Sequence, residues 1–329
     1  MRLVDFVGLP ALAAVLGVAL ALPASAQRRD TGFDLVRLDA SARAAAMAGA
    51  PGAIGGADPT VAFYNPALLT PDMSRAVAVG YTNHVSEIAA GTLLYARDVP
   101  RLGATLAASV RYLSYGDFDG AGPDGTPDGT TFGAGEAALT LSGAREVAPR
   151  VRAGASVNLL TTRIADARGA ALTADLGATY EVPSQQLVLG ASVHHVGATL
   201  SSLGATTDRL PTDVRLTVAK RLRYLPLTVS VAGYDLAGIE GDAPGDSSAV
   251  RRALDHVAVG GEMRLGRALA VRAGFNPRRA GDLDGGQRLD LGGVSMGFGL
   301  SLSRVALDYA YNGWSVFGGT HQFGLRTRL

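Results

Sequence analysis

The sequence predicts an all-β protein: a transmembrane antiparallel β-barrel of about fourteen strands, with an N-terminal plug segment inside the lumen. Hydrophobic residues make up 47% of the 329 residues and charged residues only 18%. Beyond Leu22, however, no apolar run approaches the roughly 18 residues that a membrane-spanning helix requires. From Arg75 onward apolar side chains alternate with small or polar ones, and short connections alternate with long ones. Both patterns are typical of a barrel that crosses a membrane with its strands.

The first residues are typical of an export signal. Arg2 precedes an apolar run from Phe6 to Leu22, and Ala24-Ser25-Ala26 forms the small-residue pattern of a cleavage site. We therefore expect cleavage between Ala26 and Gln27 and export from a bacterial cytoplasm. The alternative is an uncleaved membrane anchor, but the apolar run is short and ends at the cleavage pattern.

The stretch from Ser41 to Leu69 resembles neither a core helix nor a strand. It is rich in Gly and Ala, and Asp58-Pro59 and Asn65-Pro66 are turn signals. Residues 41–47 are expected to form a short Ala-rich helix. We predict a signal peptide over 1–26, a plug over 27–74 and a barrel over 75–329. The residues that define the plug motif are Arg43, Gly49, Asp58, Asn65, Pro66 and Ala67.

The clearest strand pattern lies between Gly169 and Val182. Apolar residues at even positions alternate with Thr173, Asp175 and Glu181 at odd positions, so one face meets lipid and the other a polar interior. The same reasoning predicts strands near 75–82, 87–97, 101–115, 133–147, 150–164, 169–182, 186–198, 212–223, 225–236, 253–266, 268–277, 292–301, 303–313 and 319–329.

The connections between these strands predict the orientation of the barrel. Most are short at one end, and the connections 116–132, 199–211, 237–252 and 277–291 at the other end are longer. Because outer-membrane barrels have short periplasmic turns and long outer loops, both termini are placed on the periplasmic side. The connections 83–86 and 165–168 are short for outer loops.

Charged residues that fall on the inward phase should line the lumen. They are Arg111, Glu136, Arg152, Asp175, Glu181, Arg215, Glu262, Arg264, Arg272, Asp308 and Arg326. Charges inside a barrel must pair wherever water is scarce, so we expect salt bridges between strands and to the plug. A substrate pathway is the alternative interpretation of the same charges.

Catalytic, metal and cofactor chemistry are not expected. Cysteine is absent, and the adjacent His194 and His195 should point to opposite faces of a strand. The 117–128 segment begins like a calcium loop, but Ala121 stands where an oxygen ligand is required. A net charge of +1 gives no general attraction to nucleic acid. A hydrolase assembled from residues distant in sequence is the open alternative.

Several stretches resemble a known family. SARAAAMAGA and DPTVAFYNPALL, which contains Asn65-Pro66-Ala67, are similar to the plug region of the FadL-like outer-membrane proteins. Within that group the chain resembles the PorQ family of the type IX secretion system. This resemblance rests on YLSYGDFD at 112–119, the stretch from Arg209 to Val231, DYAY at 308–311 and the ending HQFGLRTRL. The final Leu329 departs from the terminal aromatic residue common in such barrels.

The resemblance implies a non-enzymatic protein of the bacterial outer membrane that helps attach secreted cargo to the cell surface. Its implied partners are membrane lipid and attachment-complex proteins similar to PorU, PorV and PorZ, which would bind the outer loops 116–132 and 237–252. The alternative is a FadL-type channel for long-chain fatty acids or other hydrophobic compounds. That channel would need an apolar pocket beside the plug and a kinked strand that opens toward lipid. A soluble periplasmic β-sandwich is a third possibility.

Overall fold

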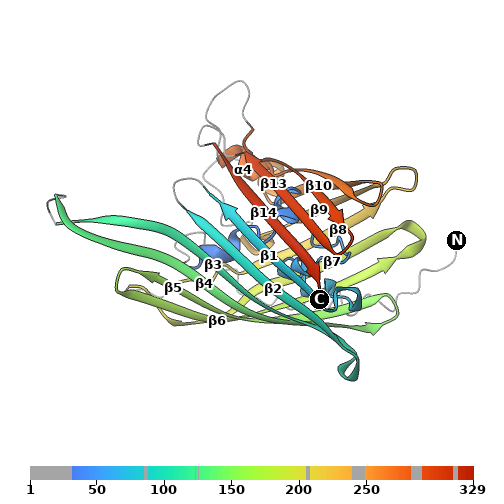
Figure 1. The fold of residues 1–329 in the computed structure, drawn as a ribbon, viewed down its shortest axis with the longest axis horizontal. Helices are drawn as coiled ribbons and strands as arrows, with labels where there is room; N and C mark the ends of the chain where they lie inside the picture. The colour runs from blue at the N-terminus through green and yellow to red at the C-terminus, as the bar shows by residue number, and fades with distance from the viewer. Residues whose placement is uncertain are drawn as a thin grey trace.

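The computed structural model describes residues 32–84, 88–122, 124, 126–204, 208–238, 249–282, 291–313 and 318–329. The expected signal peptide and its cleavage site at Ala26 and Gln27 lie outside these residues. In the described part of the chain, fourteen antiparallel strands form one closed barrel in which each strand pairs with its sequence neighbours and β1 pairs with β14 (Figure 1). This confirms the predicted fold class.

The strands closely follow the alternating segments of the sequence. They are β1 (Ala76–Asn83), β2 (Ala89–Val99), β3 (Ala104–Ala121), β4 (Pro127–Ala148), β5 (Val151–Ile164), β6 (Ala167–Val182), β7 (Leu187–Ser201), β8 (Asp213–Arg221), β9 (Leu227–Gly233), β10 (Val257–Leu265), β11 (Leu269–Phe275), β12 (Val294–Leu302), β13 (Val305–Gly313) and β14 (Gly319–Arg328).

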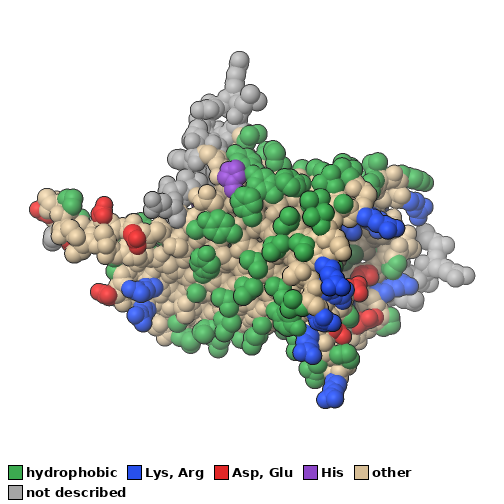
Figure 2. Space-filling view, viewed as in Figure 1, with side chains coloured by type: hydrophobic (Ala, Val, Ile, Leu, Met, Phe, Trp, Pro, Cys, Tyr) green, Lys and Arg blue, Asp and Glu red, His purple; other side chains and the backbone are tan. Residues whose placement is uncertain are grey.

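Side chains on the two faces of the strands have opposite character. On β5, Val157 and Leu159 are 52% and 41% exposed, whereas Ser156 and Asn158 between them are 2% and 4% exposed. Figure 2 shows the same division on the visible face, with a hydrophobic band across the barrel and charged side chains gathered toward its two ends. Exposed aliphatic groups in such a band match a hydrocarbon surrounding, and the buried polar groups fill the interior.

The connections differ from the expectation at three places. The segment 116–132 is not a loop, because β3 and β4 continue through it as a long hairpin that projects beyond the barrel (Figure 1). The stacked rings of Phe118 and Phe132, with centroids 5.6 Å apart, join its two strands. The helices α3 (Ala249–Asp255) and α4 (Pro277–Asp282) form mainly within the predicted connections 237–252 and 277–291, and α3 also takes the first three residues of the strand predicted over 253–266.

Among the described residues, no helix has both the length and the apolar character needed to cross a membrane. The C-terminus lies beside the start of β1, where the Leu329 N–H donates to the Arg75 carbonyl at 2.9 Å. It therefore lies at the end of the barrel that carries the short turns, as predicted.

Residues 32–74, called the N-terminal segment from here on, lie within the ring of strands. The segment consists of short helical turns: η2 (Asp34–Arg37), α2 (Ala42–Ala45), η3 (Pro59–Phe63), η4 (Pro66–Leu68) and η5 (Pro71–Met73). Helix α2 contacts β12, β13 and β14, η4 contacts β4, β5 and β6, and η3 contacts β1 and β2. Because these strands lie on different sides of the barrel, the segment is enclosed by them (Figure 1).

The expected Ala-rich helix is present but shorter than 41–47. Ser41 caps α2 by accepting a hydrogen bond from the Ala44 N–H at 3.3 Å. The helix ends at Ala45, and the turn that follows it closes at Gly49, which adopts a φ of +77° and donates its N–H to the Ala44 carbonyl. Small side chains let this part of the backbone pack closely against β12–β14.

Candidate functional site

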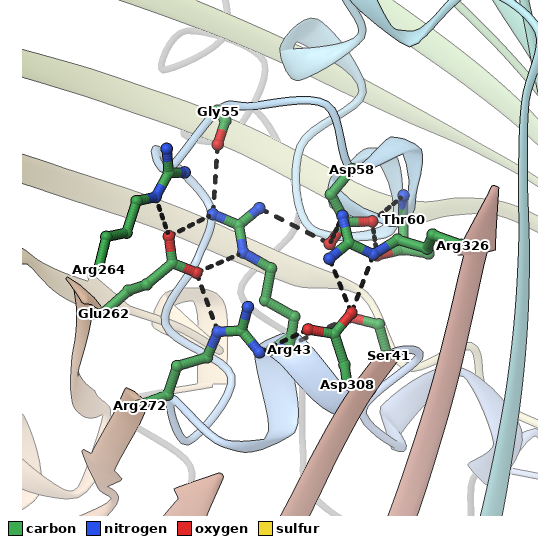
Figure 3. A network of polar contacts seen from close by, with 11 residues as sticks. Ser41, Arg43, Gly55, Asp58, Thr60, Glu262, Arg264, Arg272, Asp308 and Arg326 are labelled. Carbon is green, nitrogen blue, oxygen red and sulfur yellow. Dashed lines mark hydrogen bonds and ion pairs between the residues drawn. The ribbon is translucent and has the colours of Figure 1, made fainter. Parts of the chain in front are cut away.

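A buried ionic network joins the N-terminal segment to the barrel wall (Figure 3). The Arg43 guanidinium of α2 donates from Nε to Glu262 Oε2 at 2.8 Å and from Nη2 to Glu262 Oε1 at 3.2 Å. Glu262 of β10 also accepts a hydrogen bond from Arg272 of β11 at 2.9 Å. Arg272 in turn donates to Asp308 of β13 at 2.7 Å. All four side chains are nearly inaccessible to solvent, so each charge depends on these partners.

Asp58 closes the network from the N-terminal segment. Its carboxylate lies 3.6 Å from Arg43 and 3.8 Å from Arg326 of β14, which also pairs with Asp308 at 2.7 Å. The backbone N–H and hydroxyl of Thr60 both donate to Asp58 as well. Burial raises the pKa of Asp58, but Arg326 and Arg43 outweigh it and hold that pKa below its usual value.

Arg111 and Glu136, two of the expected lumen charges, bind the backbone of the N-terminal segment around η2. Arg111 of β3 donates to the carbonyls of Leu35 and Leu38 at 2.9 and 2.8 Å. Glu136 of β4 accepts the N–H groups of Asp34 and Leu35 at 3.1 and 2.7 Å. These two strand residues therefore fix the segment around η2 through charge-assisted hydrogen bonds.

The Asn65-Pro66-Ala67 motif is buried against β5 and β6. Asn65 Oδ1 caps η4 by accepting the Ala67 N–H at 3.0 Å, and its Nδ2 donates to the Ala178 carbonyl of β6 at 3.2 Å. Arg152 of β5 donates to the carbonyls of Ala67 and Leu69. The motif thus connects the turn to two strands through backbone groups.

The expectation for the adjacent histidines is wrong. At this point of the β6–β7 ladder one extra residue is inserted into β7, and His195 has a φ of +57°. The bulge turns both rings inward, with their centroids 5.8 Å apart. His194 contacts the Tyr64 carbonyl at 3.1 Å, while the His195 N–H donates to Asp175 at 2.8 Å. Nevertheless, no group of three or more His, Asp or Glu in the described residues is arranged to hold a metal.

The remaining lumen residues differ in exposure. Asp175 is buried on the inner face of β6, whereas Glu181, near the end of the same strand, is exposed to solvent. Arg264 is largely exposed but still pairs with Glu262 at 3.2 Å. Arg215 of β8 pairs with Asp213 at 2.5 Å, and its guanidinium lies over the Tyr64 ring.

A cavity of about 310 Å³ lies between the N-terminal segment and the outer ends of β7–β11. Its volume is within the range of small-molecule sites. Its lining combines seven charged side chains with apolar groups from Val36, Ala48, Pro211 and the Tyr234 ring. The residues that line it are Val36, Arg37, Asp39, Ala48, Gly49, His195, Pro211, Thr212, Asp213, Arg215, Tyr234, Asp235, Asn276, Arg278 and Arg279.

Three ion pairs are built into the cavity wall. Besides Arg215–Asp213, Arg278 pairs with Asp235 at 3.0 Å, and Arg279 of α4 pairs with Asp39 of the N-terminal segment at 3.1 Å. Burial lowers the pKa of Arg279, but Asp39 outweighs it, so that pKa is raised. Arg37 is exposed at the cavity and has no ion pair with any described residue.

The wall beside His195 is not a continuous ladder. Pairing between β7 and β8 ends at His194 and Asp213, although β6 continues to pair with β7 as far as Ser201. The chain just before β8 covers this place, since Thr212 donates its hydroxyl to the His195 carbonyl at 3.3 Å and Thr199 donates to the Asp208 carbonyl at 2.7 Å.

Gly49, His195 and Arg215 line the cavity and stand out in the sequence for other reasons, but no sequence pattern indicated the cavity itself. Asp39, Asp213 and Asp235 lie just outside or at the ends of regular elements, where alternation does not define a face. The signal that could have indicated it is the gathering of Asp and Arg residues at the outer strand ends. The partner of each, such as Arg279 for Asp39, is set only by the closed barrel.

No family model and no curated protein matches the sequence. Solved structures do match the fold. The Pseudomonas putida toluene transporter TodX has a TM-score of 0.57 at 14% identity, with 90% of this chain and 98% of TodX covered. The monoaromatic hydrocarbon channel CymD has a TM-score of 0.55 at 12% identity, with 90% and 99% covered. At such identities the likeness establishes a shared barrel fold.

Proposed function

We propose that this protein is a non-enzymatic outer-membrane channel that admits a small solute at the outer cavity, with the N-terminal segment as its internal gate. The arrangement of the cavity carries this proposal. It lies at the end of the barrel with the long connections, and the N-terminal segment bounds it on the inner side. Below it, the ionic network holds the segment across the bore.

The shared fold supports a transport role, because TodX and CymD are described as a toluene transporter and a hydrocarbon channel. A FadL-type channel for hydrophobic compounds needs a kinked strand and an apolar pocket. The bulge in β7 gives a bent strand beside the cavity. The cavity is lined by charged side chains as well as apolar ones, so it is not the wholly apolar pocket that such a channel needs. These observations therefore support a transport role for the protein more strongly than they support a hydrophobic substrate.

Cross-linking tests the gate directly, because the chain has no native cysteine. A Cβ placed on Gly324 of β14 would lie 3.7 Å from the Ala42 Cβ of α2, within the range that a disulfide spans. The double variant Ala42→Cys/Gly324→Cys would be folded into planar bilayers in KCl. We expect channel openings under reducing conditions and their loss on oxidation, while either single-cysteine variant is unaffected by oxidant.

Two outcomes contradict the proposal. One is the absence of current above that of protein-free bilayers under reducing conditions. The other is unchanged current after complete cross-linking, measured on the same sample by a non-reducing gel.

The second candidate is an attachment component of the PorQ type, with proteins similar to PorU, PorV and PorZ as partners. The observation that favours it is the projecting β3–β4 hairpin, a stiff extension suited to protein contact. Replacing 116–132 by an Asn-Gly turn would keep the barrel and remove the extension. If this candidate is correct, large surface proteins co-purify with the native chain and not with the shortened one. Equal recovery from both would contradict it.

A further inference from the structure

The charges around the outer cavity are not balanced. Four arginines and three aspartates line it, which leaves a formal surplus of one positive charge when His195 is neutral. Each of the three carboxylates already accepts a hydrogen bond from an arginine of the cavity wall. Asp213 also accepts the Asp235 N–H at 2.6 Å. Negative charge in the cavity is therefore neutralised by the protein itself.

The arginines retain donor capacity. A guanidinium carries five N–H donors in a planar fork, whereas the ion pairs of Arg215 and Arg279 each use one nitrogen. Arg37 has no ion pair with a described residue. An incoming group would thus meet unsatisfied donors and carboxylates already engaged. This combination selects an acceptor with negative charge.

The apolar side chains of the lining are those of Val36, Ala48, Pro211 and Tyr234, and they share the wall with seven charged side chains. Placing a hydrocarbon in this cavity would remove water from charged groups without replacing their hydrogen bonds, which is costly. The cavity also has room for only a small molecule at about 310 Å³.

From these observations we infer that the outer cavity binds a small hydrophilic organic anion, with its carboxylate at Arg37 and its remaining atoms against the Arg215 and Arg279 side of the cavity. This inference rests on the proposed function for its biological meaning, since the anion would be the solute that the channel admits. It sets this cavity apart from a site for aromatic hydrocarbon or long-chain fatty acid.

Calorimetric titration of the detergent-solubilised full chain at pH 7.5 tests the inference without requiring transport. The probes are benzoate, its uncharged isostere benzamide, and oleate. We expect benzoate to bind, benzamide to bind at least about tenfold more weakly because one charge-assisted contact is lost, and oleate not to compete with benzoate.

Arg37→Gln is the informative variant, because Arg37 is exposed and its loss leaves the wall ion pairs intact. We expect about tenfold weaker benzoate binding, partly restored in Arg37→Lys. Arg101→Gln, at an exposed arginine of the opposite, short-turn end, is the matched control and should bind as the native chain does. Equal binding of benzoate and benzamide, competition by oleate, or native affinity in Arg37→Gln would overturn the inference.

The two proposals can fail separately. Benzoate binding without bilayer current would contradict the channel and leave the anion site standing. Current without any benzoate binding would overturn the anion site and leave the channel standing.

Discussion

Arg43 of the N-terminal segment and Glu262 of β10 are 219 residues apart in sequence and form a bidentate, hydrogen-bonded ion pair inside the barrel. Arg272 binds the same carboxylate from the neighbouring strand. Replacing Glu262 therefore leaves two buried guanidinium groups without their shared acceptor. The pair is the part of the ionic network that most directly connects the segment to the wall.

Glu262→Gln should lower the free energy of unfolding by about 3–5 kcal/mol, because it leaves buried charge uncompensated. It should also raise the frequency of channel openings, since the N-terminal segment is held less firmly. Arg264→Gln is the control, because Arg264 binds the same carboxylate from an exposed position and its loss should cost about 1 kcal/mol or less. Denaturant titration and bilayer recording measure the two effects. An equal loss of unfolding free energy in Glu262→Gln and Arg264→Gln would contradict the view that burial gives this ion pair its importance.

Acid should loosen the N-terminal segment through Asp58. The folded-state pKa of this carboxyl is lowered, so its stabilising contribution is complete above the unfolded value of about 3.8 and is lost as the pH falls through the folded value. The loss should show as increased conductance at low pH. In Asp58→Asn this part of the pH dependence should be absent, with stability at pH 7 already reduced by about 1–3 kcal/mol. An unchanged pH profile in Asp58→Asn would refute this account.

Gly154→Ala should displace the N-terminal segment from β5. A Cβ at this position would lie 2.5 Å from both the Ala67 nitrogen and the Pro66 carbonyl carbon, so backbone would have to move. We expect a loss of roughly 1–3 kcal/mol and faster proteolysis near Asn65. Gly261→Ala on β10 is the matched control, because its added Cβ would have its nearest neighbour at 3.5 Å. Similar protease sensitivity in the two variants would argue against close packing of the segment on β5.

The lipid-facing band can be tested at Leu159, whose side chain is 41% exposed in the middle of β5. Leu159→Arg should destabilise the barrel in phospholipid vesicles by about 2–4 kcal/mol, the cost of a cation near the bilayer centre. Leu102→Arg, in the exposed turn after β2, should change stability little. Reversible unfolding in vesicles measures the free energy of unfolding of both variants. A cost no larger at Leu159 than at Leu102 would contradict the assignment of this face to hydrocarbon.

Much of the barrel could be predicted because period-two alternation is a local property of the chain. The Gly169–Val182 pattern became β6, with Asp175 buried inside and Leu172 exposed outside. The strand ends were harder to predict, because the 116–132 segment contains Gly, Pro and Asp yet continues two strands. Cross-strand contacts such as the Phe118–Phe132 stack stabilise that hairpin, and no local pattern indicated them.

The candidate site was less predictable for the same physical reason. The alternation along their strands predicts that Glu262 and Asp308 point inward. Their pairing with Arg43 and Arg272 depends on how the N-terminal segment lies inside the closed barrel. His195 illustrates the limit further. One inserted residue in β7 removed the expected opposition of the His194 and His195 side chains, and only the register against β6 reveals that insertion.

The sequence by itself determined the class of fold, the approximate strands, their lipid and interior faces and the small-residue stretch that fits within the bore. Only the tertiary structure decided which charges meet and where a cavity remains. Alternation depends on neighbouring residues, whereas the Arg279–Asp39 pair joins positions 240 residues apart and exists only once α4 lies over the enclosed N-terminal segment.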